Sequence, residues 1–239
     1  MPAVLDPAAL TLAERVAALE HVTSVCLIGS SARGDGDRGS DVDLLAVVDA
    51  KDHVRDVRRR APHMLGDRRV QTRVVDERRL ADILDRRSTF AVHVLREAVV
   101  VHDAGERFAR LRARYPRDAP SHTNPDEIAR RLEVYEDLEW CQGLYLYCLA
   151  DCYAAGRAAT FALLGGRCIF EFSAAHAFTR LALDEPRLAP PVRRIARLRP
   201  FFVLADRDTA GPLPFPYRDC RPEAEAAIAA AHELIDACR

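Results

Sequence analysis

Two aspartates stand two positions apart in an otherwise apolar segment, where Asp41 and Asp43 alternate with Val42 and Leu44. Alternate residues of a β-strand point to the same face, so both carboxylates would lie side by side at the start of a strand. Adjacent carboxylates repel each other unless a cation lies between them, and Mg²⁺ is commonly held by one or two carboxylates together with substrate phosphates. The spacing therefore predicts a magnesium site with Asp41 and Asp43 as its ligands.

A glycine and two serines precede the aspartates, at the end of another strand-like run. Val22–Ile28 is short, apolar and rich in β-branched residues, which is typical of a buried strand. It ends at Gly29, where a side chain would block the close approach of a ligand. Ser30 and Ser31 then offer hydroxyl and backbone N–H groups at a turn into a short helix. Such a turn predicts a phosphate-binding site.

Together these segments resemble the DNA polymerase β-like nucleotidyltransferase superfamily, whose signature is Gly-Ser followed by Asp-x-Asp or Asp-x-Glu. A longer form of the signature is typical of the minimal and the antibiotic-modifying members. The sequence matches that longer form at Gly29, Ser30, Ala32, Arg33, Gly34, Ser40, Asp41, Asp43 and Leu44. The resemblance covers residues 1 to about 115, and it extends to the rest of the chain only in architecture.

The resemblance implies a role for each matching residue. Gly29 and Ser30 would hold the triphosphate, Ser40 would brace the loop, and Arg33 would neutralise a phosphate or anchor the turn. The two aspartates would bind Mg²⁺ as catalytic residues, in a site that could take one ion or two. The implied reaction is attack of a hydroxyl on the α-phosphate of a nucleoside triphosphate, with ATP the expected triphosphate and pyrophosphate the leaving group.

The sequence departs from the family pattern at a third carboxylate, which many members place on the next strand. That strand is expected at Val70–Val75, and it carries Gln71 or Arg73 where an acid is expected. Asp76 follows the strand and comes too late. Either the enzyme is degenerate or another segment supplies the base, as a glutamate of the helical domain does in kanamycin nucleotidyltransferase-like enzymes.

Glu139 is the candidate for that base. A long helix is expected to begin after the cap Asn124 and to run to about Ala155, and on it Glu139 interrupts an apolar stripe. Burial would raise the pKa of such an acid, which suits a general base. The alternative is an ion pair with an arginine, for example within 193–199, and Glu136 is the reserve candidate. The neighbouring aromatic residues Trp140, Tyr145 and Tyr147 are expected in the core, with stacking on a base or sugar as the alternative.

The order of apolar patterns predicts two domains joined by a proline-rich linker at residues 116–125. Residues 1–117 alternate helix and strand and predict an α/β (α+β) domain with a small mixed sheet. Residues 124–239 are almost purely helical and predict an all-α bundle, which is HEPN-like by resemblance.

The individual elements follow from hydrophobic period and caps. Strands are expected at Val22–Ile28, Asp41–Val48, Val70–Val75 and Ala98–Val101. A capping box at Thr11 and Glu14 predicts the start of the first helix. Further helices are expected at Val54–His63, Phe108–Tyr115, Phe172–Leu183, Pro191–Leu198 and Pro222–Cys238.

Composition narrows the class of protein. A net charge of −1, with acids interleaved among the arginines, disfavours a nucleic-acid surface, although nucleic acid and a homodimer stay open as partners. Seven cysteines without a CxxC pair predict small core residues rather than zinc ligands, with Cys148 and Cys152 as the alternative metal pair. No apolar run is long enough to cross a membrane, and no basic region precedes an apolar stretch at the N-terminus, so a cytoplasmic protein is expected.

These observations favour an Mg²⁺-dependent nucleotidyltransferase that moves a nucleoside monophosphate, AMP, to a hydroxyl of a small molecule. Acceptors of the aminoglycoside or lincosamide type follow from the resemblance, with the helical half on the acceptor side. Two alternatives remain. The acceptor could be a protein or tRNA, or the chain could be a non-catalytic, antitoxin-like protein that binds nucleotide.

Overall fold

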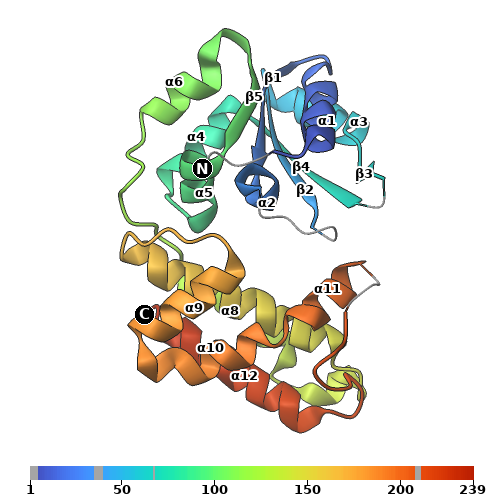
Figure 1. Ribbon diagram of the computed structural model, residues 1–239, viewed down its shortest axis with the longest axis vertical. Coiled ribbons are helices and arrows are strands. Elements are labelled where there is room, and N and C mark those ends of the chain that lie inside the picture. The colour runs from blue at the N-terminus through green and yellow to red at the C-terminus, as the bar shows by residue number, and fades with distance from the viewer. Residues whose placement is uncertain (1–4, 35–39, 67, 208–210) are drawn as a thin grey trace. The chain divides into compact units, whose positions relative to one another are not determined.

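The computed structural model describes residues 5–34, 40–66, 68–207 and 211–239. Contacts divide the chain into two compact units, Met1–Ala119 and Pro120–Arg239 (Figure 1). The first unit holds a small mixed sheet with helices, and the second is helical. The expected fold class, an α+β domain followed by an all-α domain, is therefore confirmed.

The sheet of the first unit has five strands in the order β3-β4-β2-β1-β5. Their bounds are β1 Val22–Ile28, β2 Val42–Val48, β3 Met64–Leu65, β4 Arg68–Asp76 and β5 Val99–Asp103. Strand β1 is antiparallel to β2 and β5, whereas β2 and β4 run parallel. The sheet is therefore mixed, with β2 at its centre between β4 and β1.

Helices cover both faces of this sheet (Figure 1). The unit contains α1 Pro7–Ala17, α2 Gly29–Arg33, η1 Lys51–His53, α3 Val54–Arg60, α4 Glu77–Asp85, α5 Thr89–Glu97, η2 Ala104–Glu106 and α6 Arg107–Ala113. Side chains of β2 alternate between two cores, so Leu44 packs on the side of α1 and Leu45 packs on the side of α4 and α5. Burial on both faces explains why β1 and β2 are apolar runs with little polar alternation.

Helix α1 begins four residues before the predicted capping box. Asp6 caps it by accepting a hydrogen bond from the Ala8 N–H at 2.9 Å, and Pro7 takes the first helical position. Thr11 therefore lies inside the helix, where its hydroxyl donates to the Pro7 carbonyl at 3.1 Å. The prediction was wrong because the Asp-Pro pair supplies an earlier start.

The second unit is built around α8 Leu146–Gly166. Its other elements are α7 Pro125–Ala129, η3 Glu133–Tyr135, η4 Leu138–Cys141, α9 Ala174–Asp184, η5 Pro186–Leu188, α10 Ala189–Ala196, α11 Arg199–Arg207 and α12 Arg221–Asp236. Helix α8 packs against α9, α10, α11 and α12, so it is buried along most of its length. This explains why its sequence is apolar all round.

The long helix expected from Asn124 to Ala155 is not continuous. Asn124 caps α7 as predicted, by accepting from the Asp126 N–H at 2.9 Å, but α7 ends at Ala129. The backbone then turns in short 3₁₀ segments, and Gln142 and Gly143 adopt the left-handed conformation with φ of 48° and 78°. Left-handed residues cannot continue a right-handed helix, so α8 starts afresh beyond them.

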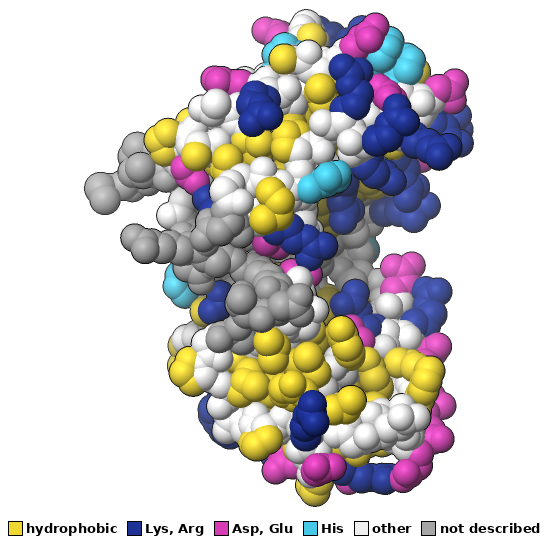
Figure 2. Space-filling view, turned by 90° about the vertical axis from the view of Figure 1, so that its right-hand side faces the viewer, with side chains coloured by type: hydrophobic (Ala, Val, Ile, Leu, Met, Phe, Trp, Pro, Cys, Tyr) yellow, Lys and Arg dark blue, Asp and Glu magenta, His cyan; other side chains and the backbone are white. Residues whose placement is uncertain are grey.

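The broken helix changes the surface of this unit. Trp140 and Tyr147 are exposed to 66% and 67%, so their expected place in the core is wrong, whereas Tyr145 is buried as expected. Figure 2 shows hydrophobic side chains gathered on one face of the helical unit and basic side chains gathered on the N-terminal unit. The seven cysteines are free thiols, and Cys26, Cys148, Cys152 and Cys220 are buried. Within the described part of the chain, no helix has the length and apolar character that crossing a membrane requires.

Candidate functional site

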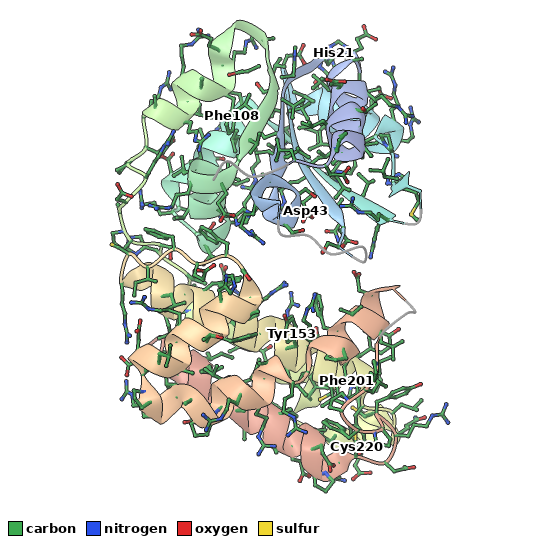
Figure 3. All side chains as sticks on the ribbon, viewed as in Figure 1. His21, Asp43, Phe108, Tyr153, Phe201 and Cys220 are labelled. Atoms are coloured by element: carbon green, nitrogen blue, oxygen red, sulfur yellow. The ribbon has the colours of Figure 1, made fainter. Side chains whose placement is uncertain are left out.

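The turn after β1 lies against Asp43, the aspartate within β2. Gly29 follows β1 with a left-handed φ of +67°, and Ile28 is paired with Asp43 across the sheet. A Cβ on Gly29 would lie 2.6 Å from Asp43 Oδ2, closer than any real contact of this kind. Glycine is therefore required here both by conformation and by space, because the Asp43 carboxylate lies next to the backbone of the turn. Figure 3 labels Asp43 in the N-terminal unit.

Asp41 is the second carboxylate of this site. Asp41 immediately precedes β2, and its Oδ2 accepts a hydrogen bond from the Gln71 amide at 2.8 Å. Gln71 lies on β4 directly opposite Asp43 in the parallel register. The buried Ser31 hydroxyl of α2 donates to the Asp41 carbonyl at 3.4 Å. Strands β2 and β4 and helix α2 thus bring both carboxylates to one edge of the sheet.

This set of groups fits a magnesium ion. Mg²⁺ takes oxygen ligands and usually combines one or two carboxylates with water and phosphate oxygens. Asp41 and Asp43 are both half-buried, and the Asp43 carboxylate lies close to the backbone of Gly29.

The place expected for a third carboxylate is filled by uncharged and basic side chains. Gln71 occupies the strand position opposite Asp43, and Arg73 lies two residues along β4 with its guanidinium 4.1 Å from the Phe90 ring centroid. Desolvation lowers the pKa of Arg73 and the charge of Asp43 raises it, so these two side chains interact. Asp76 is used elsewhere, because its carboxylate caps α4 by accepting from the Arg79 N–H at 2.8 Å.

A series of side-chain contacts that begins on α5 stabilises the Gly29 turn. The Gly29 N–H donates to His93 Nε2 at 2.9 Å, His93 Nδ1 lies 3.3 Å from Glu97 Oε2, and Arg33 Nη1 lies 3.0 Å from the same oxygen. Because Nε2 accepts, Nδ1 carries the proton and faces Glu97. Burial, with the nearby charge of Arg33, lowers the pKa of His93 to about 4, so the ring is neutral near pH 7.

His93 and Glu97 were not among the predicted site residues. Their spacing of four residues on a helix is the one sequence signal, and it indicates a contact between them without indicating that they touch the turn. Arg33 was expected to neutralise a phosphate or to anchor the turn; it pairs with Glu97 at 3.0 Å, and its role stays a prediction.

The remaining predicted residues of the first unit lie around the same turn. Ser30 is half-buried in the first turn of α2, and Gly34 ends that helix by donating its N–H to the Ser30 carbonyl at 2.9 Å. The Ser40 carbonyl accepts from Arg68 Nε at 3.0 Å, which ties the start of β2 to β4. Residues 35–39 of the glycine-rich segment lie outside the described residues.

Glu139 lies in the second unit and is not buried. It stands in the 3₁₀ segment η4, its side chain is 76% exposed, and it forms an ion pair with Arg221. The expected burial was wrong because Asp137 caps this segment by accepting from the Glu139 N–H at 2.9 Å, so no continuous helix turns Glu139 toward the core. Glu136, the reserve candidate, is exposed as well. The role of Glu139 as base stays a prediction.

Part of the chain matches a known protein family. Residues 10–91 match the model of a family described as nucleotidyltransferase domain. The matched segment contains the Gly29 turn, both aspartates, Gln71 and Arg73. No curated protein matches the chain.

Proposed function

We propose that the protein transfers AMP from ATP to a hydroxyl of a small-molecule acceptor, because residues 10–91 match the model of the nucleotidyltransferase domain family. The transfer forms a bond between the acceptor oxygen and the α-phosphorus. It breaks the bond from that phosphorus to the bridging oxygen, so that pyrophosphate leaves, and the hydroxyl proton passes to a base. Catalysis of this kind depends mainly on positioning and on neutralising phosphate charge.

The observation that carries the proposal is the contact between Gly29 and Asp43. A phosphate held by the backbone of the Gly29–Ser30 turn would lie next to the carboxylates of Asp43 and Asp41. Asp41 and Asp43 would hold Mg²⁺, which when bound supplies positive charge to the phosphates. The contacts of Arg33 with Glu97, of Glu97 with His93 and of His93 with the Gly29 N–H keep the turn in the conformation that phosphate binding requires.

The acceptor class and the base belong to the same proposal. An aminoglycoside- or lincosamide-like compound offers several hydroxyl groups and rings. The exposed aromatic faces of Trp140 and Tyr147 in the helical unit suit contact with such rings. Glu139 is the proposed base, and its exposure leaves its carboxylate accessible to a substrate, although it must leave its ion pair with Arg221 to act.

A second candidate function is nucleotide binding without transfer. The observation that favours it is the filling of the third carboxylate position by Gln71, together with the interaction between Arg73 and Asp43. A site with fewer acids binds divalent cations less strongly. Such a protein would bind a triphosphate with Mg²⁺ and leave it intact.

Calorimetric titration separates these functions. ATP, GTP, CTP and UTP are titrated into wild type and into Asp43→Asn, with and without Mg²⁺, and Asp82→Asn on the exposed surface of α4 serves as a matched control. Mg²⁺-dependent binding that Asp43→Asn alone abolishes supports the site and identifies the base of the nucleotide. Transfer of α-labelled phosphate to a panel of aminoglycosides and lincosamides then supports the enzyme, and binding without transfer to any acceptor supports the second function. Absence of binding to all four triphosphates contradicts both.

A further inference from the structure

A second group of metal-ligating side chains lies at the opposite end of the central strands from Asp43. Val22 pairs with Val48 at one end of β1 and β2, and Ile28 pairs with Asp43 at the other. His21 and Asp49 flank the first of these pairs, and His53 follows at the end of η1. Figure 3 shows His21 and Asp43 at opposite ends of the sheet.

The three side chains lie close together. His21 Nδ1 lies 3.3 Å from Asp49 Oδ2, and His53 Nδ1 lies 2.6 Å from Asp49 Oδ1. One ligand atom from each residue lies within 4.8 Å of the others. The two imidazole rings stack with centroids 3.5 Å apart and planes inclined by 13°. Each side chain is between 33% and 39% exposed, so an ion from solvent can reach the group.

The backbone fixes this arrangement. The Asp49 N–H donates to the His21 carbonyl at 3.1 Å, and His21 is held in the left-handed conformation with φ of 70°. Asp49 and His53 are four residues apart and are joined by the short 3₁₀ turn Lys51–His53. The three ligands therefore come from two segments that are held together without an ion, and this lowers the entropy cost of binding one.

Glu20 lies beside the nitrogen of His21 that would not bind the ion. Its Oε1 lies 3.6 Å from His21 Nε2, the ring nitrogen that faces away from Asp49. Histidines that bind metals usually donate their other ring N–H to a carboxylate, carbonyl or water, which orients the ring and makes it more basic. His21 thus has a carboxylate at both of its nitrogens.

We propose that His21, Asp49 and His53 bind a divalent transition-metal ion of the Zn²⁺ type, in a site separate from the Asp41 and Asp43 pair. Imidazole suits Zn²⁺, Co²⁺, Ni²⁺ and Cu²⁺, whereas Mg²⁺ and Ca²⁺ take oxygen ligands. A tetrahedral Zn²⁺ with bonds of about 2.0–2.1 Å holds its ligand atoms about 3.3 Å apart, which the His21–Asp49 distance already meets. The ion links the turn between α1 and β1 to the segment between β2 and α3, and its fourth position is open to water.

Cobalt serves as a visible probe for this site. Co²⁺ is titrated into the full chain in the presence of excess Mg²⁺, which occupies the Asp41 and Asp43 carboxylates, and Zn²⁺ is then added as competitor. We expect one equivalent of Co²⁺ to give d–d absorption without thiolate charge transfer, and Zn²⁺ to displace it. Cys168→Ser, which removes the exposed thiol, should leave the spectrum unchanged.

Variants of the ligands locate the ion. His21→Gln and His53→Gln should each weaken affinity by about 100-fold or more, since loss of an outer partner alone costs roughly 10–100-fold. Glu20→Gln should weaken it by about 10-fold, and His63→Gln, an exposed histidine of the same unit, should not change it. Wild type that takes up no Co²⁺ or Zn²⁺ overturns the proposal whatever the variants do. Equal uptake by wild type and folded His21→Gln overturns it too.

Discussion

The side-chain amide of Gln71 donates a hydrogen bond of 2.8 Å to Asp41 Oδ2, and Gln71 itself lies on β4 directly opposite Asp43. An uncharged group thus contacts one of the two acids at the position where many nucleotidyltransferases place a third. The hydrogen bond lowers the repulsion between the aspartates without adding negative charge. It stabilises the site in the absence of a cation and reduces the charge available to bind one.

Gln71→Glu should make the protein more dependent on Mg²⁺. Three neighbouring carboxylates repel each other, so we expect the free energy of unfolding to fall by about 1 kcal/mol without Mg²⁺ and to recover with it. Thermal unfolding with and without Mg²⁺ measures this. Gln142→Glu adds the same charge to an exposed position of the helical unit and should show no such dependence. An equal effect with and without Mg²⁺ would show that Gln71 does not face the metal site.

Gly29→Ala should abolish nucleotide binding. The added Cβ would overlap Asp43 Oδ2, and the left-handed backbone costs about 1 kcal/mol more for alanine than for glycine. Gly105→Ala is the matched control, because Gly105 has a φ of +62° with nothing within 4 Å of the added atom. We expect both variants to lose stability in urea unfolding, Gly29→Ala more, and only Gly29→Ala to lose ATP binding by calorimetry. Normal ATP binding by Gly29→Ala would contradict the phosphate site.

Glu139→Gln tests the proposed base. Removal of a general base lowers the rate by roughly 10²–10⁴-fold, so transfer to the acceptor should fall by at least about 100-fold while ATP binding stays unchanged. Glu225→Gln is the control, because Glu225 contacts the same arginine, Arg221, at 2.9 Å. Both ion pairs are exposed, so neither change should unfold the protein. Equal rates for wild type and Glu139→Gln would remove Glu139 from the mechanism.

Four of the five strands in the described residues could be predicted from the sequence because local pattern determines them, whereas the two-residue strand β3 was missed. Val22–Ile28 has the predicted bounds, and the strand predicted at Asp41–Val48 is confirmed from Val42 onward, since each combines β-branched residues with burial on both faces. Helix starts were less predictable. Asp6 and Thr11 both precede helical patterns, and only the structure shows which of them caps α1.

The interior of the predicted long helix shows why the rest could not be predicted. The helical period of the sequence placed Glu139 on an apolar face. In the structure Asp137 caps a short 3₁₀ segment, and the left-handed residues Gln142 and Gly143 end it, so Glu139 does not lie on a continuous helix. The contact between His93 and Gly29 was not predictable for another reason. It joins residues 64 positions apart, and nothing in the local sequence of α5 indicates which backbone group the ring will accept from.

Acid should weaken the hold of His93 on the turn. Burial lowers its pKa from 6.5 to about 4, whereas the unfolded chain protonates it near its ordinary value. Between pH 6.5 and 4 the unfolded state therefore binds more protons than the folded state. The contribution of neutral His93 to the free energy of unfolding is complete above pH 6.5 and is lost as the pH falls to 4. The difference corresponds to about 3 kcal/mol in the free energy of unfolding.

Urea unfolding at several pH values measures this loss. His93→Gln cannot bind the proton, and its amide oxygen can still accept from the Gly29 N–H, so its loss of stability between pH 6.5 and 4 should be smaller by about 3 kcal/mol. His63→Gln, which alters an exposed histidine, should follow wild type. ATP binding should fall over the same range in wild type, because a protonated Nε2 no longer accepts from Gly29 and the phosphate turn loses its anchor. Parallel pH profiles for wild type and His93→Gln would mean that the ring is already protonated, or exposed, in the folded protein.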